Sequence, residues 1–387
     1  MYRIGQEEID AITRVINSRD LFKINGGAQE CMHFEEELKE KFGVKYALLM
    51  TSGSAALTSA LIGMGVGPGD EVIVPAYTYI ATAIAVTATG AVPVIADADD
   101  SLTLDPEDFE KKISSHTKAV IPVHIQGFAC DMDRICAIAK KHGILVLEDA
   151  CQADGGTYKG RRLGTIGDAG AYSFNYFKVI TSGEGGALVT NDRAIYERGL
   201  IYHDSSAIAY FGNQLDGISE PQFCGTEFRV SEFTGAIMRE QLKKLDPILS
   251  DLRRNKKYLM DKLGSGYRFL RTNDPDGGCP TTLPFFFGSV EDAVAFKAKA
   301  DAAGYGGTRP IDTGKHVYCN WTPVMEKRGA FNPKFDPFKM PENQGLQTDY
   351  SPDMCKRTLD YLSRTVYIGV DPGMDAKALD EMASRLA

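Results

Sequence analysis

Three short segments of the chain carry residue types that could bind a phosphorylated ligand and do chemistry on it. The first is Thr51–Ser54 (TSGS), which follows an apolar run and precedes a helical pattern. Ser52 or Ser54 can cap the helix, and Gly53 permits a close approach of the backbone. Because the first N–H groups of a helix are free and carry a partial positive charge, this turn can bind a phosphate. The alternative is an ordinary capped helix that binds nothing.

The second candidate is Asp149, at the end of the apolar run ILVLED. Ligands of open α/β sheets bind at the carboxyl ends of the strands. A carboxylate at the end of an apolar strand is costly unless it is paired. The alternative is an ordinary turn residue. Glu148 points to the opposite face, because side chains alternate along a strand, and we expect a structural role for it.

The third candidate is Lys178, which stands among aromatic and aliphatic residues in the run YSFNYFKVITSGEGG. Removing water from an amine lowers its pKa from about 10.4 and makes it a usable nucleophile. The GEGG sequence that follows favours a sharp turn. The alternative is a lysine whose stem packs on apolar surface while its amine stays in water.

The three candidates together suit pyridoxal 5'-phosphate. The helix N-terminus after Thr51 would bind the phosphate, and Lys178 would form a Schiff base with the aldehyde. Asp149 would keep the pyridine nitrogen protonated, so that the ring acts as an electron sink.

The elements around these segments predict an α/β fold. Short, continuously apolar runs alternate with helical patterns over residues 45–195. This is typical of a mostly parallel, seven-stranded sheet that is covered by helices and joined by right-handed crossovers. The predicted strands are Tyr46–Met50, Glu71–Pro75, Val92–Ala96, Ala119–His124, Ile144–Leu147, Gly170–Phe174 and Ala187–Thr190.

The pattern changes after Ser231, where a long helical stretch begins that Pro247 must interrupt or kink. Shorter strands and helices follow, as in a small α+β domain. We therefore predict a large domain of residues 1–245 that binds the cofactor. Residues 246–387 would form a small domain that contributes to the substrate site, and its stretch 317–349 would be a long ordered loop.

Composition limits the class of protein. The chain of 387 residues is 43% hydrophobic and carries a net charge of −9, which argues against bulk binding to nucleic acid. The 8 cysteines are scattered without a CxxC pair, so we expect reduced thiols and no metal site. The uncharged run 72–96 contains Pro75, Gly90 and Pro93, which favours a soluble core over a membrane span. A soluble, cytoplasmic protein is the expectation.

The chain resembles the DegT/StrS family of pyridoxal-phosphate-dependent sugar aminotransferases, which have fold type I of the aspartate aminotransferase superfamily. The resemblance spans nearly all of residues 1–387. It is strongest at TSGSAAL, GPGDEVIVPAYTYIATA, EDACQADGGTYKGRRLGTIGDAGAYSF and KxxTSGEGG. It implies transfer of an amino group from glutamate or glutamine to a keto-sugar, either nucleotide-linked or an oxidised octulosonate; free inososes and phosphorylated keto-sugars are alternatives. It also implies a homodimer with active sites at the subunit interface.

The resemblance implies roles for single residues. Lys178 matches the lysine that binds the cofactor and later moves protons, and Asp149 matches the acid that faces the pyridine nitrogen. Gln152 matches the side chain beside the ring hydroxyl. Tyr79 matches the aromatic residue that stacks on the ring, although Tyr77 is also available and either could be plain core. The residues that match phosphate ligands are Gly53, Ser54 and Ser173.

One segment departs from the family pattern. The family shows Gly-x-Asn-aromatic-Arg, whose asparagine reaches the cofactor phosphate of the partner subunit, whereas this chain has Gly225–Arg229 (GTEFR). An ionised Glu227 cannot donate a hydrogen bond and would repel a phosphate dianion. Glu227 turns away, or Arg229 or a water compensates it, or the contact between subunits is lost.

Two other functions are compatible with the resemblance. Some family members are sugar dehydratases with histidine at the lysine position, and a catalytically silent regulator could keep the fold. Lys178 favours transamination over both. Substrate selectivity is expected in the C-terminal half, where a pocket or ordinary loop packing could involve His316, Asn320 and Arg328, with His203 as a further substrate neighbour.

Overall fold

A seven-stranded sheet forms the centre of the computed structural model, which describes residues 2–23, 27–206 and 214–387. The spatial order of its strands is β1 (Tyr46–Met50), β9 (Gly186–Thr190), β8 (Ala169–Ser173), β5 (Leu145–Asp149), β4 (Thr117–Val120), β2 (Glu71–Pro75) and β3 (Val92–Ala96). Within this sheet β9 is antiparallel to both neighbours, and the other pairs are parallel. The predicted α/β class and mostly parallel sheet are confirmed. Strand β4 ends earlier than expected, because Pro122 has no N–H to give to a ladder.

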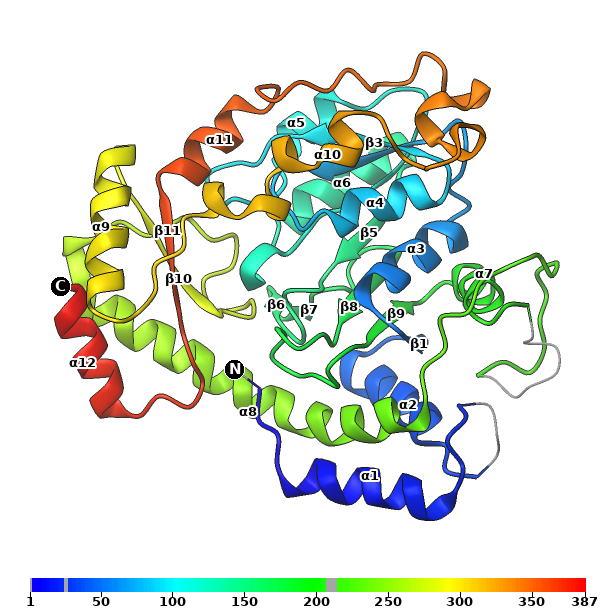
Figure 1. Cartoon of the computed structure of the whole chain (residues 1–387), viewed down its shortest axis with the longest axis horizontal. Coiled ribbons are helices and arrows are strands. Elements are labelled where there is room, and N and C mark those ends of the chain that lie inside the picture. Colours follow the sequence, from blue (N-terminus) through cyan, green and yellow to red (C-terminus); the bar gives the residue numbers. More distant parts are fainter. Residues whose placement is uncertain (1, 24–26, 207–213) are drawn as a thin grey trace.

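Helices cover both faces of the sheet, because strand side chains alternate between two apolar cores (Figure 1). Leu49 faces one core and Leu48 faces the other. The first core includes buried residues of α2 (Glu30–Phe42), α5 (Pro106–Lys111), α6 (Met132–His142) and α8 (Glu232–Leu263). The second core includes buried residues of α3 (Gly53–Gly63), α4 (Ala81–Ala88) and α7 (Arg193–His203).

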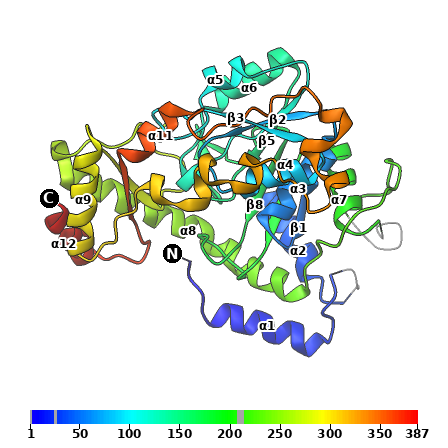
Figure 2. The same cartoon turned by 45° about the horizontal axis from the view of Figure 1, so that its top comes forward.

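The elements after α8 gather at one end of the molecule (Figures 1 and 2). Two antiparallel strands, β10 and β11, pair there beside α9 and α12. The bounds of these elements are β10 (Thr282–Phe286), α9 (Val290–Ala302), α10 (Thr322–Met325), α11 (Lys356–Ser363), β11 (Thr365–Gly369) and α12 (Ala376–Leu386). The remaining elements are α1 (Gln6–Ser18), which packs along α8, and the small hairpin of β6 (Thr157–Tyr158) and β7 (Arg161–Arg162).

Helix α8 is continuous over its 32 residues, so Pro247 does not interrupt it. The proline ring cannot bond to the carbonyl of Lys243, but both residues are exposed and water can bond to that carbonyl. The domain boundary expected near residue 245 falls inside this helix. The division into residues 1–245 and 246–387 therefore stays a prediction.

The predicted long loop 317–349 contains α10 and several single 3-10 turns. Asn343 fixes it to the large sheet region, because its amide donates to the carbonyl of Gly90 (2.8 Å) and accepts from the N–H of Gly69 (2.6 Å). Over the described part of the chain, every helix is too short or too polar to cross a membrane.

Gly186 begins β9 at a point where the strand touches the turn after β1. A Cβ atom at Gly186 would lie 2.3 Å from the carbonyl carbon of Ser52 and 2.6 Å from the nitrogen of Gly53. These atoms belong to the backbone, so they cannot turn aside as a flexible side chain would. The absence of a side chain at Gly186 is therefore what allows β9 to lie against the TSGS turn.

We expect Gly186→Ala to lower the free energy of unfolding by about 3 kcal/mol, because overpacking against fixed backbone forces the strand away. The matched control is Gly369→Ala at the end of β11, where an added Cβ meets nothing within 4 Å. The control should change stability by less than about 0.5 kcal/mol. Urea denaturation of both variants is the measurement, and equal stabilities would contradict this packing.

Candidate active site

Three of the predicted segments meet at one edge of the sheet. Strands β1, β5 and β8 run in the same direction, so the turns that follow them share the carboxyl edge. A Cβ atom at Gly53 would lie 2.7 Å from the Sγ atom of Cys151 and 3.0 Å from the Cβ atom of Ser173. The TSGS turn, the turn after Asp149 and the end of β8 are thus in direct contact.

The TSGS turn forms the N-terminus of α3. The hydroxyl of Ser52 accepts a hydrogen bond from the N–H of Ala55 (3.1 Å), so Ser52 is the cap. Ser54 is exposed, whereas Gly53 is buried against Cys151. The first N–H groups of a helix have no partner within the helix. Together with the Ser54 hydroxyl they form a site that suits an anion.

Asp149 is buried at the end of β5, and two donors hold its carboxylate. The hydroxyl of Thr82 donates to Oδ2 (2.8 Å), and the N–H of Cys151 donates to Oδ1 (3.1 Å). The Thr82 hydroxyl is in turn 2.8 Å from that of Thr78. These contacts provide the partners that a buried carboxylate requires. Asp149 was expected from the sequence, whereas the two threonines on the neighbouring segment were not.

Glu148 faces the other side of the strand and has the structural role expected for it. Its carboxylate accepts from the N–H groups of Gly164 (2.9 Å), Ile166 and Gly167 (2.7 Å). The Nε2 atom of His124 lies 3.0 Å from the same carboxylate. Because the N–H of Cys130 donates to His124 Nδ1 (3.2 Å), the ring proton is on Nε2 and is donated to Glu148. Glu148 therefore ties the turn that precedes β8 to β5.

Lys178 lies in the segment between β8 and β9 and is half-buried. The backbone N–H of Lys178 donates to the carbonyl of Asn175 (2.9 Å), and this bond closes a turn next to the GEGG sequence. The ammonium group of Lys178 opposes the rise that burial causes in the pKa of Asp154, and it contributes to the lowered pKa of His316, whose main cause is burial. The charge of Lys178 therefore acts on groups from the turn after β5 and from the C-terminal half of the chain.

Tyr79 and Gln152 flank this region. The ring of Tyr79 is 41% exposed, whereas that of Tyr77 is 1% exposed and belongs to the core. Only Tyr79 of the two can therefore meet a ligand. It lies 5.4 Å from the ring of His316, measured between centroids. The Oε1 atom of Gln152 accepts from the N–H of Gln126 (3.0 Å).

His316 reaches Tyr79 because its segment lies along the chain after β2. The N–H of Thr78 donates to the carbonyl of His316 (3.0 Å), and the N–H of Ile80 donates to that of Lys315 (2.9 Å). The indole of Trp321, which is buried, donates to the carbonyl of Lys315 (2.9 Å) and fixes the turn. A residue of the C-terminal half thus lies beside Tyr79, and its part in substrate selectivity stays a prediction.

The other residues predicted for selectivity have different surroundings. Asn320 is exposed, and Arg328 pairs with Glu326 at the surface. His203 is buried at the end of α7, where burial lowers its pKa well below 6.5 and neither ring nitrogen finds a partner among the described residues. Of the four candidates, the structure brings His316 alone into ring contact with Tyr79 within the described part of the chain.

The charge of Glu227 is compensated within the chain. Its carboxylate pairs with the guanidinium of Arg229 and also accepts from the N–H of Arg229 (3.0 Å). Arg229 pairs in addition with buried Asp204. Of the alternatives left open by the sequence, compensation by Arg229 is the one that these contacts support.

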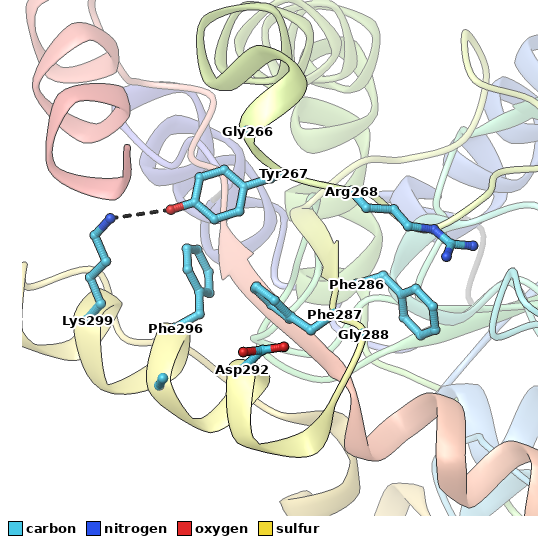
Figure 3. Close-up of a pocket in the computed structure, with 10 residues that line it drawn as sticks. Gly266, Tyr267, Arg268, Phe286, Phe287, Gly288, Asp292, Phe296 and Lys299 are labelled. Atoms are coloured by element: carbon cyan, nitrogen blue, oxygen red, sulfur yellow. Dashed lines mark hydrogen bonds between the residues drawn. The ribbon is translucent and has the colours of Figure 1, made fainter.

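A pocket in the C-terminal part of the chain is separate from this edge (Figure 3). Its aromatic lining includes Tyr267, Phe286 and Phe296, and the amine of Lys299 lies 3.3 Å from the hydroxyl of Tyr267. The guanidinium groups of Arg268 and Arg364 lie over the ring of Phe286, which is buried. None of the residues predicted for catalysis or cofactor binding lines this pocket.

Sequence reasoning missed four residues of the carboxyl edge: Thr78, Thr82, Cys151 and Asp154. Asp154 and Cys151 stand in the run EDACQAD. Because they follow Asp149 closely in the sequence, they could have been expected near it. The threonines stand in an apolar helical stretch where nothing local marks them. The whole edge offers an anion site, a paired carboxylate and an amine, which can bind a phosphorylated ligand and attack its carbonyl group.

A model of the DegT/DnrJ/EryC1/StrS aminotransferase family matches residues 2–282. The spore coat polysaccharide biosynthesis protein SpsC of Bacillus subtilis is 41% identical over 248 residues, which are 63% of this chain and 63% of that protein. A GDP-perosamine synthase of Caulobacter vibrioides is 38% identical over 239 residues, 61% of this chain and 62% of that one. The chain thus spans about three fifths of the length of these two relatives.

Longer matches extend the similarity. An L-glutamine:2-deoxy-scyllo-inosose aminotransferase of Streptomyces paromomycinus is 33% identical over 312 residues, 78% of this chain and 72% of that protein. Among solved structures, an aminotransferase from Psychrobacter cryohalolentis is 28% identical, with a TM-score of 0.80 over 99% of this chain and 96% of that chain. The similarity in structure therefore includes the C-terminal elements.

We expect Glu148→Gln to lower the free energy of unfolding by about 3 kcal/mol, because the new amide N–H₂ group faces backbone donors and leaves them buried without an acceptor. Glu107→Gln, at an exposed site on α5, is the control and should be nearly neutral. Thermal and urea unfolding check the difference. A Glu148→Gln variant as stable as the control would show that the carboxylate is dispensable.

Proposed function

Because the chain belongs to the DegT/DnrJ/EryC1/StrS aminotransferase family, we propose that it is a pyridoxal-phosphate-dependent aminotransferase. It transfers an amino group from glutamate or glutamine to a keto-sugar. The observation that carries this proposal is the meeting of the α3 N-terminus, the paired carboxylate of Asp149 and the Lys178 segment at one sheet edge.

The residues at this edge fit the cofactor by their chemistry. The free N–H groups of α3 and the hydroxyls of Ser54 and Ser173 suit its phosphate, and Gly53 leaves the space that a side chain would fill. Asp149 retains acceptor capacity for a protonated ring nitrogen, because a carboxylate has about four acceptor positions and two are occupied. Tyr79 is proposed to stack on the ring.

Pyridoxal phosphate, when bound, supplies an electron sink for the bonds that break at the substrate carbon. Lys178 would hold the cofactor covalently, and its free amine would take a proton from the donor carbon and deliver one to the acceptor carbon. Thr82 and the N–H of Cys151 keep the Asp149 carboxylate in a fixed orientation. Gln152 is proposed to lie beside the ring hydroxyl.

The acceptor is proposed to be a keto-sugar or a keto-cyclitol. One relative is named for the GDP-linked amino sugar that it makes, and another for glutamine and an inosose. These names support a nucleotide-linked sugar or an inosose more than an oxidised octulosonate, and they support glutamine as donor. Residues 246–387 are proposed to contribute to selectivity through His316, which lies beside Tyr79. A cytoplasmic location is proposed because all 8 cysteines are free.

We expect Lys178→Ala to keep the fold and to lose at least about 10⁴-fold in turnover, because one amine serves as covalent partner and as acid–base group. Borohydride reduction of the wild-type enzyme should attach the cofactor to the peptide that contains Lys178. Lys140→Ala, at an exposed site on α6, is the control and should keep both activity and tag. A tag on a different lysine would refute the assignment.

The chain is also proposed to form a homodimer whose subunits cover the residues next to Lys178. Tyr176 and Phe177 are 59% and 76% exposed, which is unusual for aromatic side chains beside a reactive group. We expect light scattering to give the mass of a dimer for the wild type and a lower mass for Phe177→Asp. The control Phe331→Asp, at a fully exposed site, should stay dimeric. An active wild-type monomer would contradict the proposal.

A further inference from the structure

Gln241 lies on α8, and the proposed function gives it no role. The residue is fully buried, and both ends of its amide are bonded. The Nε2 atom donates to the carbonyl of Arg3 (2.6 Å) and to the Oε1 atom of Glu8 (2.7 Å), and the Oε1 atom accepts from the N–H of Thr181 (3.3 Å). A carbonyl and a carboxylate accept while an N–H donates, so these partners fix which way the amide faces. One buried side chain thus joins α8 to the N-terminal segment and to the segment that contains Lys178.

Thr181 closes the loop that carries Lys178. We call residues 174–185, between β8 and β9, the lysine loop; they contain neither a helix nor a strand. The buried hydroxyl of Thr181 donates to the carbonyl of Phe174 (2.8 Å) and accepts from the N–H of Gly183 (2.9 Å), so it joins the two ends of this loop. The position of the loop therefore depends on single hydrogen bonds. The bond to Gln241 is the one that ties the closed loop to α8.

The other end of the Gln241 amide has a firm anchor. Glu8 on α1 is buried, and its carboxylate accepts from the amine of Lys244 on α8 (2.7 Å) and from the N–H of Gly5 (2.7 Å). Burial alone would raise the pKa of Glu8, but hydrogen bonds from Lys244 and Gln241 hold this pKa below its usual value. Glu8 is therefore ionised at neutral pH, and a hydrogen bond to an ionised acceptor is stronger than one between neutral groups.

We propose that Gln241 is a positioning residue for Lys178, which holds the lysine loop against α8 and so fixes the place of the amine at the sheet edge. The inference rests on the proposed role of Lys178. An amine that moves protons must stay within reach of the reacting carbons, and a misplacement of about 1 Å can cost about 10²-fold in rate. A residue remote from the reacting atoms can therefore control the rate through the loop.

The first test measures the opening of the lysine loop by hydrogen exchange of the full-length protein. The N–H groups of Tyr176, Lys178 and Gly183 all make hydrogen bonds within the loop, so their exchange with deuterium reports how often the loop opens. Gln241→Met removes the amide at nearly constant size. We expect the peptide 174–185 to exchange at least about fivefold faster in this variant, because the loop loses its bond to α8. Unchanged exchange overturns the proposal.

The second test separates positioning from a merely structural role. The holoenzyme is mixed with L-glutamine or L-glutamate, and the loss of the near-visible band of the lysine-bound cofactor is followed. For Gln241→Met we expect the maximal rate per cofactor-carrying site to fall about tenfold or more, and the half-saturating donor concentration to stay within about twofold. A merely structural residue would change the amount of folded protein and leave this maximal rate unchanged, and that result also overturns the proposal.

Asn255 provides a matched control on the same helix. It is fully buried, and its amide donates to the carbonyl of Asp371 (2.9 Å). Asn255→Leu should lower stability but leave the exchange of the lysine loop and the maximal rate unchanged. If Gln241→Met does not fold, Gln241→Asn replaces it in both assays with the same expected directions, because its shorter amide cannot reach Thr181 and Glu8 together.

Borohydride mapping of the wild-type holoenzyme distinguishes the two levels of the argument. A cofactor tag on Lys178 combined with unchanged loop exchange in the Gln241 variant refutes the positioning role alone. A tag on a different lysine refutes the proposed role of Lys178, whatever the exchange of the loop.

Discussion

Carboxylates that are taken out of water need hydrogen-bond donors, and the end of β5 meets this need twice. Glu148 accepts hydrogen bonds from three backbone N–H groups and from the ring of His124. These four bonds use all the acceptor positions of the carboxylate and fix the neighbouring turn. Among the residues that the structure describes, Asp149 accepts only from the Thr82 hydroxyl and from one backbone N–H, that of Cys151. Since the two acids are adjacent, the register of β5 decides which of them is structural and which can face a ligand.

The topology explains how much of this arrangement could be predicted. Parallel strands end at one edge, so the residues after β1, β5 and β8 could be expected at the same edge once the apolar runs were recognised as strands. The order of the strands, which the sequence did not predict, places these turns next to one another. Thr82 could not be found this way, because its bond to Asp149 joins residues 67 positions apart and a threonine in an apolar helix gives no local signal. Pro247 shows the opposite case, because packing along both halves of α8 keeps the helix continuous where a local rule allowed an interruption; the alternative of a kink stays a prediction.

The C-terminal half shows a similar limit. The loop HVYCNWTP could be expected to approach the substrate, yet nothing in its composition singles out His316 from Asn320. The position of His316 is fixed by backbone hydrogen bonds from Thr78 and Ile80 and by the indole of Trp321, which together orient the turn. The negative charge of Glu227 could be recognised from the sequence, and the cation that pairs with it, Arg229, stands only two residues further along the chain. Local electrostatics could be anticipated there, whereas long-range orientation could not.

Helix α8 has a consequence for how the molecule unfolds. It packs against α1 and α2 at one end and against α12 and β10 at the other, and it is continuous across the expected domain boundary. A helix of this length spans about 48 Å, and separating the two halves would require breaking its hydrogen bonds in the middle. The two halves are therefore expected to melt as one cooperative unit, so that neither is a foldon independent of the other.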